Sequence, residues 1–144
     1  MQIAEIQVSY SLPVADRVKV LHSRSIYEVL IQQWNIDNIE FIEEAKIILL
    51  NRANIILGIY NLSKGGISGT IVDLRVILAV ALKCNASAII LAHNHPSGNL
   101  KPSEQDKQIT RKLTEACKIL ELTLLDHLIV SKQDYYSFAD DGIL

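Results

Sequence analysis

The stretch LAHNHPSGNLKPSEQD, residues 91–106, places two histidines, a serine and an aspartate within fourteen positions. An apolar run precedes the histidines, Pro96 and Gly98 follow them, and a Ser-x-x-Asp pattern then leads into a helical periodicity. Because proline and glycine interrupt regular structure, this order of residue types predicts a strand, a turn and a helix. The polar residues form either a metal site or an ordinary turn in which they happen to cluster.

The metal interpretation begins with the two histidines. His93 and His95 occupy alternate positions of the expected strand, so their side chains project from one face and can hold one ion. A catalytic zinc commonly has three protein ligands and an open position for water. Asp106 is the candidate third ligand, because it extends the apolar stripe of the following helix by one turn and points inward. A metal ion would neutralise a carboxylate that is costly to bury unpaired.

The structural alternative is a helix cap. Ser103 and Asp106 are spaced as in a capping box, in which the serine caps the helix and the acid returns a hydrogen bond. Capping leaves the preceding His-x-His unexplained, whereas a metal site explains all four residues and still accommodates the cap. The letters HNH at 93–95 also spell the label of a nuclease family, but that motif extends over a longer ββα unit.

Outward from this stretch, strands and helices alternate along the chain. A Gly/Ser-rich loop is expected at 61–70, and the apolar helix at 73–83 is expected to be largely buried. The intermingled elements predict an α/β protein, a single domain with a mixed β-sheet covered by helices. Helices are expected at 23–34, 73–83 and 103–120, and strands at 2–10, 45–50, 54–60, 87–92, 122–131 and 135–138.

Three local patterns support these elements. Ile6, Val8 and Tyr10 alternate with polar residues, which is typical of a strand. Ser25 and Glu28 have the spacing of a capping box and are expected to start the first helix. The last helix has an apolar stripe with charges on its other side, formed by Ile109, Leu113, Ala116 and Leu120.

Composition narrows the class of protein. The chain has 144 residues and a net charge of −2, from 14 basic and 16 acidic residues, so it has no general attraction to nucleic acid or anionic membranes. It contains no apolar run of the ~18 residues that a membrane span needs, and we see no signal peptide. Cys84 and Cys117 are not in a C-x-x-C pair, which favours a reducing, cytoplasmic location.

The spacing His93-x-His95-x7-Ser103-x2-Asp106 resembles the JAMM signature of MPN-type metalloproteases and isopeptidases. The longer string at 93–106 is similar to the JAB domain of the RadC family. Such a resemblance implies a single JAB/MPN-like domain with a cytidine-deaminase-like architecture. Further matching features are Arg75 near a helix start, SAIILAHNHPSG, LLDHLIVS and YYSFADDGIL.

The resemblance covers roughly residues 38–144. We interpret residues 1–37 as an N-terminal strand and helix that belong to the same globule. RadC proteins often carry an N-terminal helix–hairpin–helix module that binds DNA. Because the preceding residues have the pattern of one strand and one helix, we expect this chain to lack that module.

The resemblance implies a zinc hydrolase in which His93, His95 and Asp106 hold Zn²⁺ and water is the fourth ligand. Ser103 would donate a hydrogen bond to the developing oxyanion. Asn94 and Ser97 flank the ligands and are expected to orient them. The Asp126–His127 pair interrupts an apolar strand, so it either lines the site or ends a strand pairing.

The JAMM pattern also implies a glutamate at the start of an upstream strand, acting as general base. The chain offers Glu40, Glu43 and Glu44. Neighbouring residues of a strand point to opposite faces, so only one of Glu43 and Glu44 can face the metal. The match of EEAKIILLN to the family's strand start favours Glu43, with Glu44 as second choice and expected to point to solvent.

The expected reaction is hydrolysis of a peptide, isopeptide or related amide bond, and the substrate is a protein, a peptide or a small amide. The alternative is a DNA-associated accessory or interaction module, linked to DNA repair or mobile DNA, with a zinc site but no protease activity. Nucleic acid stays open as a partner, although the net charge does not support it. A homo-oligomer is also open, and no membrane partner is expected.

Overall fold

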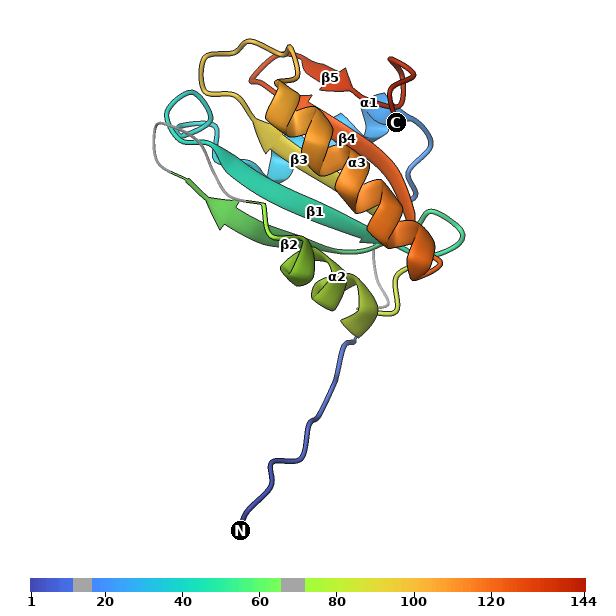
Figure 1. Cartoon of the computed structure of the whole chain (residues 1–144). Coiled ribbons are helices and arrows are strands. Elements are labelled where there is room, and N and C mark those ends of the chain that lie inside the picture. Colours follow the sequence, from blue (N-terminus) through green and yellow to red (C-terminus); the bar gives the residue numbers. More distant parts are fainter. Residues whose placement is uncertain (12–16, 66–71) are drawn as a thin grey trace.

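Strands and helices alternate along the chain and assemble into one sheet with helices on both of its faces (Figure 1). The structure, a computed structural model, describes residues 1–11, 17–65 and 72–144. The elements in these ranges are α1 (Ser23–Gln33), β1 (Glu44–Leu50), β2 (Ile56–Lys64), α2 (Leu74–Lys83), β3 (Ala88–Asn94), α3 (Glu104–Ile119), β4 (Thr123–Val130) and β5 (Tyr135–Ser137).

Within the described ranges, the sheet has five strands in the order β2-β1-β3-β4-β5. β3 and β4 are parallel and are connected through α3, and the other neighbouring strands are antiparallel. A parallel pair needs such a crossover, whereas antiparallel neighbours can be joined by short turns. The sheet is therefore mixed, and the predicted α/β class with a helix-covered sheet is confirmed.

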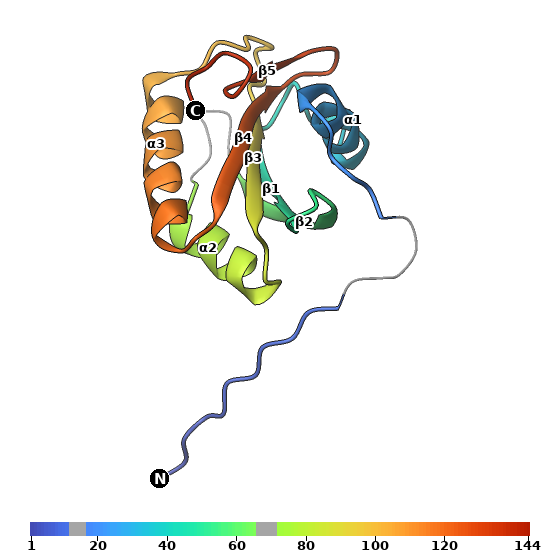
Figure 2. The ribbon, with the colours of Figure 1, turned by 90° about the vertical axis from the view of Figure 1, so that its right-hand side faces the viewer.

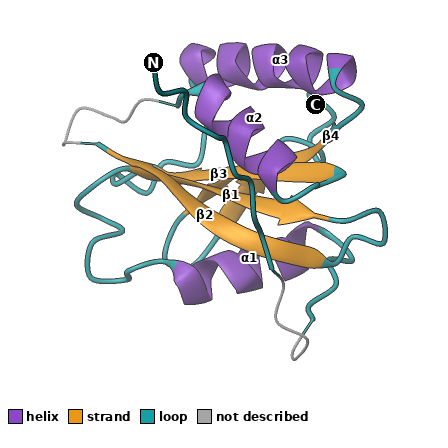
Figure 3. Ribbon diagram, turned by 90° about the horizontal axis from the view of Figure 1, so that it is seen from below, coloured by secondary structure: helices purple, strands orange, loops and turns teal. Residues whose placement is uncertain are grey.

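The two faces of the sheet carry separate apolar cores, because successive strand residues point to opposite sides. Ile90 packs in the core that includes Leu30 of α1, and Ile89 packs in the core under α2 and α3. Figures 2 and 3 show α1 on one side of the sheet and α2 with α3 on the other. The same alternation places His93 on the α3 side of β3 and Asn94 on the α1 side.

The predicted strand at 2–10 is wrong. Residues 1–11 contain no regular secondary structure and extend away from the rest of the molecule (Figure 1). Ile6 and Val8 are 86% and 67% exposed, so the alternating pattern is present without a surface to cover. Tyr10 donates a hydrogen bond to the carbonyl of Leu57. A strand requires backbone partners, which sequence alternation alone does not supply.

The division of the chain after residue 37 stays a prediction.

The predicted helix at 23–34 begins at the expected residue, Ser23, but its predicted capping box is displaced. Its N-cap is His22, and Ser25 occupies the third helical position of that capping box. Glu28 therefore takes no part in the cap and instead forms an exposed ion pair with Arg24 at 3.6 Å. The serine hydroxyl contacts the His22 backbone from inside the helix, so the capping box lies three residues before the predicted one.

Two further predictions need correction. Residues 61–64, expected in the Gly/Ser loop, belong to β2, while residues 66–70 of that loop lie outside the described residues. The helix expected to be largely buried, α2, buries only Ile77 and Ala81, and Leu82 is 54% exposed. Its N-cap at Asp73 agrees with the prediction. α2 covers the sheet near its β2 edge, where only one side of the helix meets strands.

The inward stripe of α3 is also shifted. Its buried residues are Thr110, Leu113 and Cys117, whereas Leu120 is the C-cap and is 38% exposed. The stripe thus contains a threonine on the turn that follows Asp106.

Among the described residues, no helix combines the length and the apolar composition that a bilayer crossing requires.

Candidate metal centre

The end of β3 brings two imidazoles together. His93 is 4% exposed, and its Nε2 atom lies 3.0 Å from Nε2 of His95, just beyond the end of the strand. Gly98 then turns the chain with a φ of 79°, a conformation that residues with a side chain adopt at a cost. The Gly98 amide donates to the carbonyl of His95 at 2.9 Å, which closes this turn.

Asp106 approaches both imidazoles from the first turn of α3. Its Oδ1 lies 3.2 Å from Nε2 of His93, and its Oδ2 lies 3.2 Å from Nε2 of His95. The capping box is present as well: the Asp106 amide donates to Oγ of Ser103 at 3.0 Å, and the Ser103 amide donates to Asp106 Oδ2 at 2.8 Å. The first turn of α3 therefore contains both the capping box and the contact of Asp106 with the two imidazoles.

The spacing of the three donor groups fits a zinc ion. The atoms that face one another are 3.0 to 3.2 Å apart. Around a tetrahedral Zn²⁺ with bonds of about 2.0–2.1 Å, neighbouring ligand atoms lie about 3.3 Å apart. Two imidazole nitrogens with one carboxylate are also a donor set found in catalytic zinc sites. His93, His95 and Asp106 could therefore hold Zn²⁺ with little rearrangement.

Electrostatics favour the ionised carboxylate. Burial alone would raise the pKa of Asp106, but the adjacent imidazoles of His93 and His95 outweigh burial and hold this pKa well below its usual range. The hydrogen bond to Asp106 in turn raises the pKa of His95, although burial opposes that change. Asp106 therefore stays negative at neutral pH, as a metal ligand must.

His95 is oriented by the loop that follows it. Its Nδ1 lies 2.6 Å from the carbonyl of Asn99, which can only accept a hydrogen bond. Nδ1 must therefore carry the proton, and in the neutral ring the lone pair of Nε2 faces His93 and Asp106. Second contacts of this kind commonly fix the orientation of metal-binding histidines.

The Asp126–His127 pair lies in the middle of β4 and is buried, so it does not end the strand. The ring of His127 stacks on Phe138, and its Nε2 lies 2.9 Å from Nδ1 of His93. Burial, followed by the nearby charge of His93, lowers the pKa of His127 well below its usual value. His127 thus lines the candidate site as a neutral ring.

Asp126 serves a different region. Its carboxylate accepts hydrogen bonds from Oγ of Ser137 at 2.6 Å and from the amide of Ala139 at 3.0 Å. Burial raises the pKa of Asp126, although these hydrogen bonds oppose the shift. It fixes the segment after β5 to the sheet, and that segment supplies Phe138 beneath His127.

The three candidate glutamates lie in different places. The carboxylate of Glu43, directly before β1, forms a group with His93 and His95 in which all ligand atoms lie within 4.8 Å of one another. Glu40 pairs instead with Lys132 at 2.8 Å on the surface. Glu43, the glutamate favoured from the sequence, therefore lies beside the imidazoles, and its role as general base stays a prediction.

Glu44 does not point to solvent, as was expected. It is 9% exposed and lies 3.3 Å from Nζ of Lys64 and 3.8 Å from Nζ of Lys46. Lys46 is itself buried and lies over the ring of Trp34, and burial lowers its pKa despite the nearby Glu44. The prediction failed because pairing with two lysines allows a carboxylate to be buried.

Asn94 holds the segment that carries Glu43. Its side chain is fully buried and accepts a hydrogen bond from the Glu44 amide at 2.7 Å. It also donates to the carbonyls of Ile39 and Ile42, at 2.7 and 2.9 Å. Two of these contacts lie directly before and after Glu43, so the Asn94 side chain holds the backbone around that glutamate, and the expected orientation of the ligands by Asn94 stays a prediction. No sequence pattern indicated this contact across fifty residues.

The two serines have separate positions. Ser97 is exposed, and its hydroxyl accepts from the amide of Asn99 at 3.2 Å, so it shapes the loop and makes no described contact with a ligand. The hydroxyl of Ser103 accepts from the Asp106 amide. Among the described contacts that hydroxyl acts only as an acceptor, which leaves its proton for another group.

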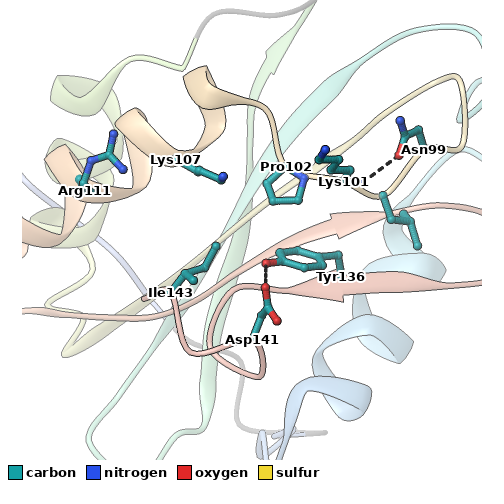
Figure 4. Close-up of a pocket in the computed structure, with 9 residues that line it drawn as sticks. Asn99, Lys101, Pro102, Lys107, Arg111, Tyr136, Asp141 and Ile143 are labelled. Carbon is teal, nitrogen blue, oxygen red and sulfur yellow. Dashed lines mark hydrogen bonds between the residues drawn. The ribbon is translucent and has the colours of Figure 1, made fainter.

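Two pockets lie beside the loop that follows His95. One, of about 270 Å³, includes His95 together with Gly98 and Lys132. The other, of about 730 Å³, lies between the 99–102 loop, the exposed side of α3 and the C-terminal segment (Figure 4). The larger pocket is lined by Asn99, Leu100, Lys101, Pro102, Lys107, Arg111, Tyr136, Asp141 and Ile143.

Three of the larger pocket's lining residues are basic, namely Lys101, Lys107 and Arg111. Its one acidic member, Asp141, accepts a hydrogen bond from the hydroxyl of Tyr136 at 2.5 Å. Burial, followed by this hydrogen bond, raises the pKa of Tyr136 to about 12. The pocket therefore has a positive balance of charge, which the sequence did not predict because its members come from three separate segments.

Known proteins are similar to this chain over most of its described length. Residues 20–143 match the family model described as RadC-like JAB domain. A UPF0758 protein of Flavobacterium johnsoniae is 50% identical over 101 residues, which are 70% of this chain and 44% of that protein. The UPF0758 protein YfjY of Escherichia coli is 44% identical over 102 residues, 71% of this chain and 64% of that protein. The chain spans about half the length of the curated relatives it matches.

Proposed function

Because the chain belongs to the family of RadC-like JAB domains, we propose that it is a zinc-dependent hydrolase of the JAMM type. Its reaction would be the cleavage of a peptide, isopeptide or related amide bond. The observation that carries the proposal is the convergence of His93, His95 and Asp106, with the carboxylate of Glu43 beside them. An isolated cap or a structural histidine pair does not require this second carboxylate.

His93, His95 and Asp106 would hold the ion and leave one position open. When bound, Zn²⁺ would lower the pKa of water from about 15.7 to near 7 and polarise the substrate carbonyl. The ionised state of Asp106 and the fixed ring of His95 support this assignment. Both ligands are prepared by contacts within the protein, so little reorganisation would accompany binding.

Glu43 would act as the general base and then as the general acid. Its carboxylate would accept a proton from the attacking water and donate that proton to the nitrogen of the leaving amine. The new carbon–oxygen bond would form first and give a tetrahedral adduct, from which the carbon–nitrogen bond of the amide then breaks. The products are a carboxylic acid and an amine, and the acid would lose its remaining proton to the amine or to solvent. Asn94 supports this role, because its hydrogen bonds hold the backbone on both sides of Glu43.

Ser103 would stabilise the charge that develops on the carbonyl oxygen. Its hydroxyl can donate one hydrogen bond while it continues to accept from the Asp106 amide. A positioned donor of this kind is often worth roughly 3 kcal/mol in the transition state. The proposed role therefore uses the cap and does not replace it.

The pockets support a substrate that extends beyond the cleaved bond. The basic side chains of Lys101, Lys107 and Arg111 would favour acidic residues near that bond. The same side chains would also contact phosphates, which favours the second candidate, a zinc-containing module associated with DNA and without protease activity. The overall charge of −2 does not favour that candidate.

Substrate profiling of zinc-loaded protein tests the proposal. The library would contain linear peptides and lysine isopeptides, each with acidic and with neutral residues around the amide bond. Cleavage that stops when a chelator removes zinc, and returns when zinc is restored, is the expected result. Zinc-loaded protein that cleaves none of these amides but binds DNA would instead support the accessory module.

A further inference from the structure

A chain of hydrogen bonds runs from one candidate ligand to the main chain of another. Nδ1 of His93 lies 2.9 Å from Nε2 of His127, and Nδ1 of His127 lies 2.6 Å from Oγ1 of Thr110. The Thr110 hydroxyl in turn donates to the carbonyl of Asp106 at 2.7 Å. His127 and Thr110 are 1% and 2% exposed, so water has little access to this chain.

The positions of the protons in this chain are coupled. Thr110 has one hydroxyl proton, and if it goes to the Asp106 carbonyl, the hydroxyl must accept from Nδ1 of His127. Nε2 of the neutral His127 ring then carries a lone pair and accepts from Nδ1 of His93. The remaining nitrogen of His93, Nε2, is thereby left with its lone pair toward His95 and Asp106.

We propose that Thr110 and His127 are positioning residues that fix the metal-binding tautomer of His93. The inference rests on the zinc site assumed in the proposed function, but it does not depend on which bond the protein hydrolyses. Thr110 selects the proton position on His127, and His127 selects it on His93. The series of hydrogen bonds ends at the main chain of Asp106, which supplies the proposed carboxylate ligand. His93 and Asp106 are therefore connected through buried side chains of β4 and α3.

Loss of the Thr110 hydroxyl would remove this selection. With valine at 110, Nδ1–H of His127 would be buried without an acceptor, which disfavours that tautomer. The other tautomer places a proton on Nε2 of His127 and directs it at Nδ1 of His93. A neutral His93 would then carry its own proton on Nε2, where the metal must bind. Partners of this type commonly change metal affinity by about 10- to 100-fold.

Thr114 of the same helix provides a matched control for the substitution of Thr110. Thr114, one turn further along α3, makes the same backbone contact, since its hydroxyl donates to the Thr110 carbonyl at 2.8 Å. The experiment compares Thr110→Val, Thr110→Ser and Thr114→Val with the unmodified protein. Zinc affinity is measured by competition with a chromophoric chelator, and the tautomers of the zinc-loaded proteins are read from long-range ¹H–¹⁵N NMR spectra of the imidazoles.

Zinc affinity is expected to fall about 10- to 100-fold in Thr110→Val, to be restored largely in Thr110→Ser, and to be unchanged in Thr114→Val. The spectra should show the proton of His127 on Nδ1. Near-equal affinities for folded Thr110→Val and the unmodified protein, or a proton on Nε2 of His127, would overturn the inference and leave the hydrolase proposal standing. If the variants show the expected zinc affinities but the zinc-loaded protein hydrolyses no amide, the hydrolase proposal is overturned and the inference stands. Failure of the unmodified protein to bind zinc would overturn both.

Discussion

His93 and Asn94 are neighbours in β3, yet they serve two different regions of the molecule. On the α3 side, His93 meets His95 and Asp106 in an arrangement that fits a metal ion. On the α1 side, Asn94 is fully buried and holds the backbone around Glu43. The proposed ligands and the proposed base thus depend on separate contacts, on opposite faces of the sheet. Metal binding and proton transfer are therefore expected to respond separately to mutation.

The largest expected effect is at the ligands. Asp106→Ala should reduce zinc affinity by more than the ~10- to 100-fold that loss of an outer partner causes, because a direct ligand is removed. Chelator competition and metal analysis of the purified protein measure the loss. Glu104→Ala is a matched control, since Glu104 lies in the same first turn but is exposed and pairs with Lys107. Equal losses of zinc affinity in both variants would show that Asp106 is not a metal ligand.

Glu43→Gln should separate the two regions most clearly. The variant should keep its zinc, because Glu43 is assigned no bond to the ion, while the rate of hydrolysis should fall by ~10² to 10⁴. The assay is kcat on a substrate from the profiling, with Glu40→Gln as an exposed control. Loss of zinc together with the rate would make Glu43 a ligand.

Glu44→Gln is expected to act on stability and not on chemistry. The change removes a charge that is paired with buried Lys46, so a thermal melt should show a lower Tm at unchanged zinc affinity. A reduced rate with unchanged zinc content would instead indicate that Glu44, not Glu43, serves the reaction.

Ser103→Ala should keep zinc and lose part of the rate. Loss of a hydrogen bond to the developing oxyanion typically lowers kcat by about 10²- to 10³-fold, and loss of the cap costs about 1 kcal/mol of stability. Zinc titration, kcat and a denaturant melt distinguish these contributions. A loss of zinc as large as that of Asp106→Ala would show that the two roles have been divided wrongly.

Asn94→Ala is expected to act through the segment that carries Glu43 and not through the proposed ligands. Asn94→Ala leaves buried backbone groups without partners, so the free energy of unfolding should fall by about 1–3 kcal/mol and kcat should fall at unchanged zinc content. Asn51→Ala is the control, because Asn51 holds the β1–β2 turn by two similar hydrogen bonds far along the sheet from His93. If both variants lose stability and neither loses rate, Asn94 has no part in positioning Glu43.

The sequence predicted the helices and the central strands because their patterns are local. The strand ending at His93, the turn at Gly98 and the helix capped by Ser103 follow from apolar runs, glycine and capping residues that are close together in the chain. The pattern at 2–10 was equally regular but wrong, since a strand also needs partners. Apolar periodicity therefore predicts which side of an element is apolar, and only packing decides whether that side is buried.

By itself, the sequence determined the family and the set of polar residues at the end of β3, because their spacing along a strand and a helix fixes which side chains share a face. The sequence favoured Glu43 as the glutamate beside the imidazoles, where the structure places it. Only the tertiary structure decided that Glu44 is paired with lysines, and that His127 and Thr110 contact His93 and Asp106. These contacts join residues from different elements. Their distances depend on strand order, register and helix placement, which no local pattern contains.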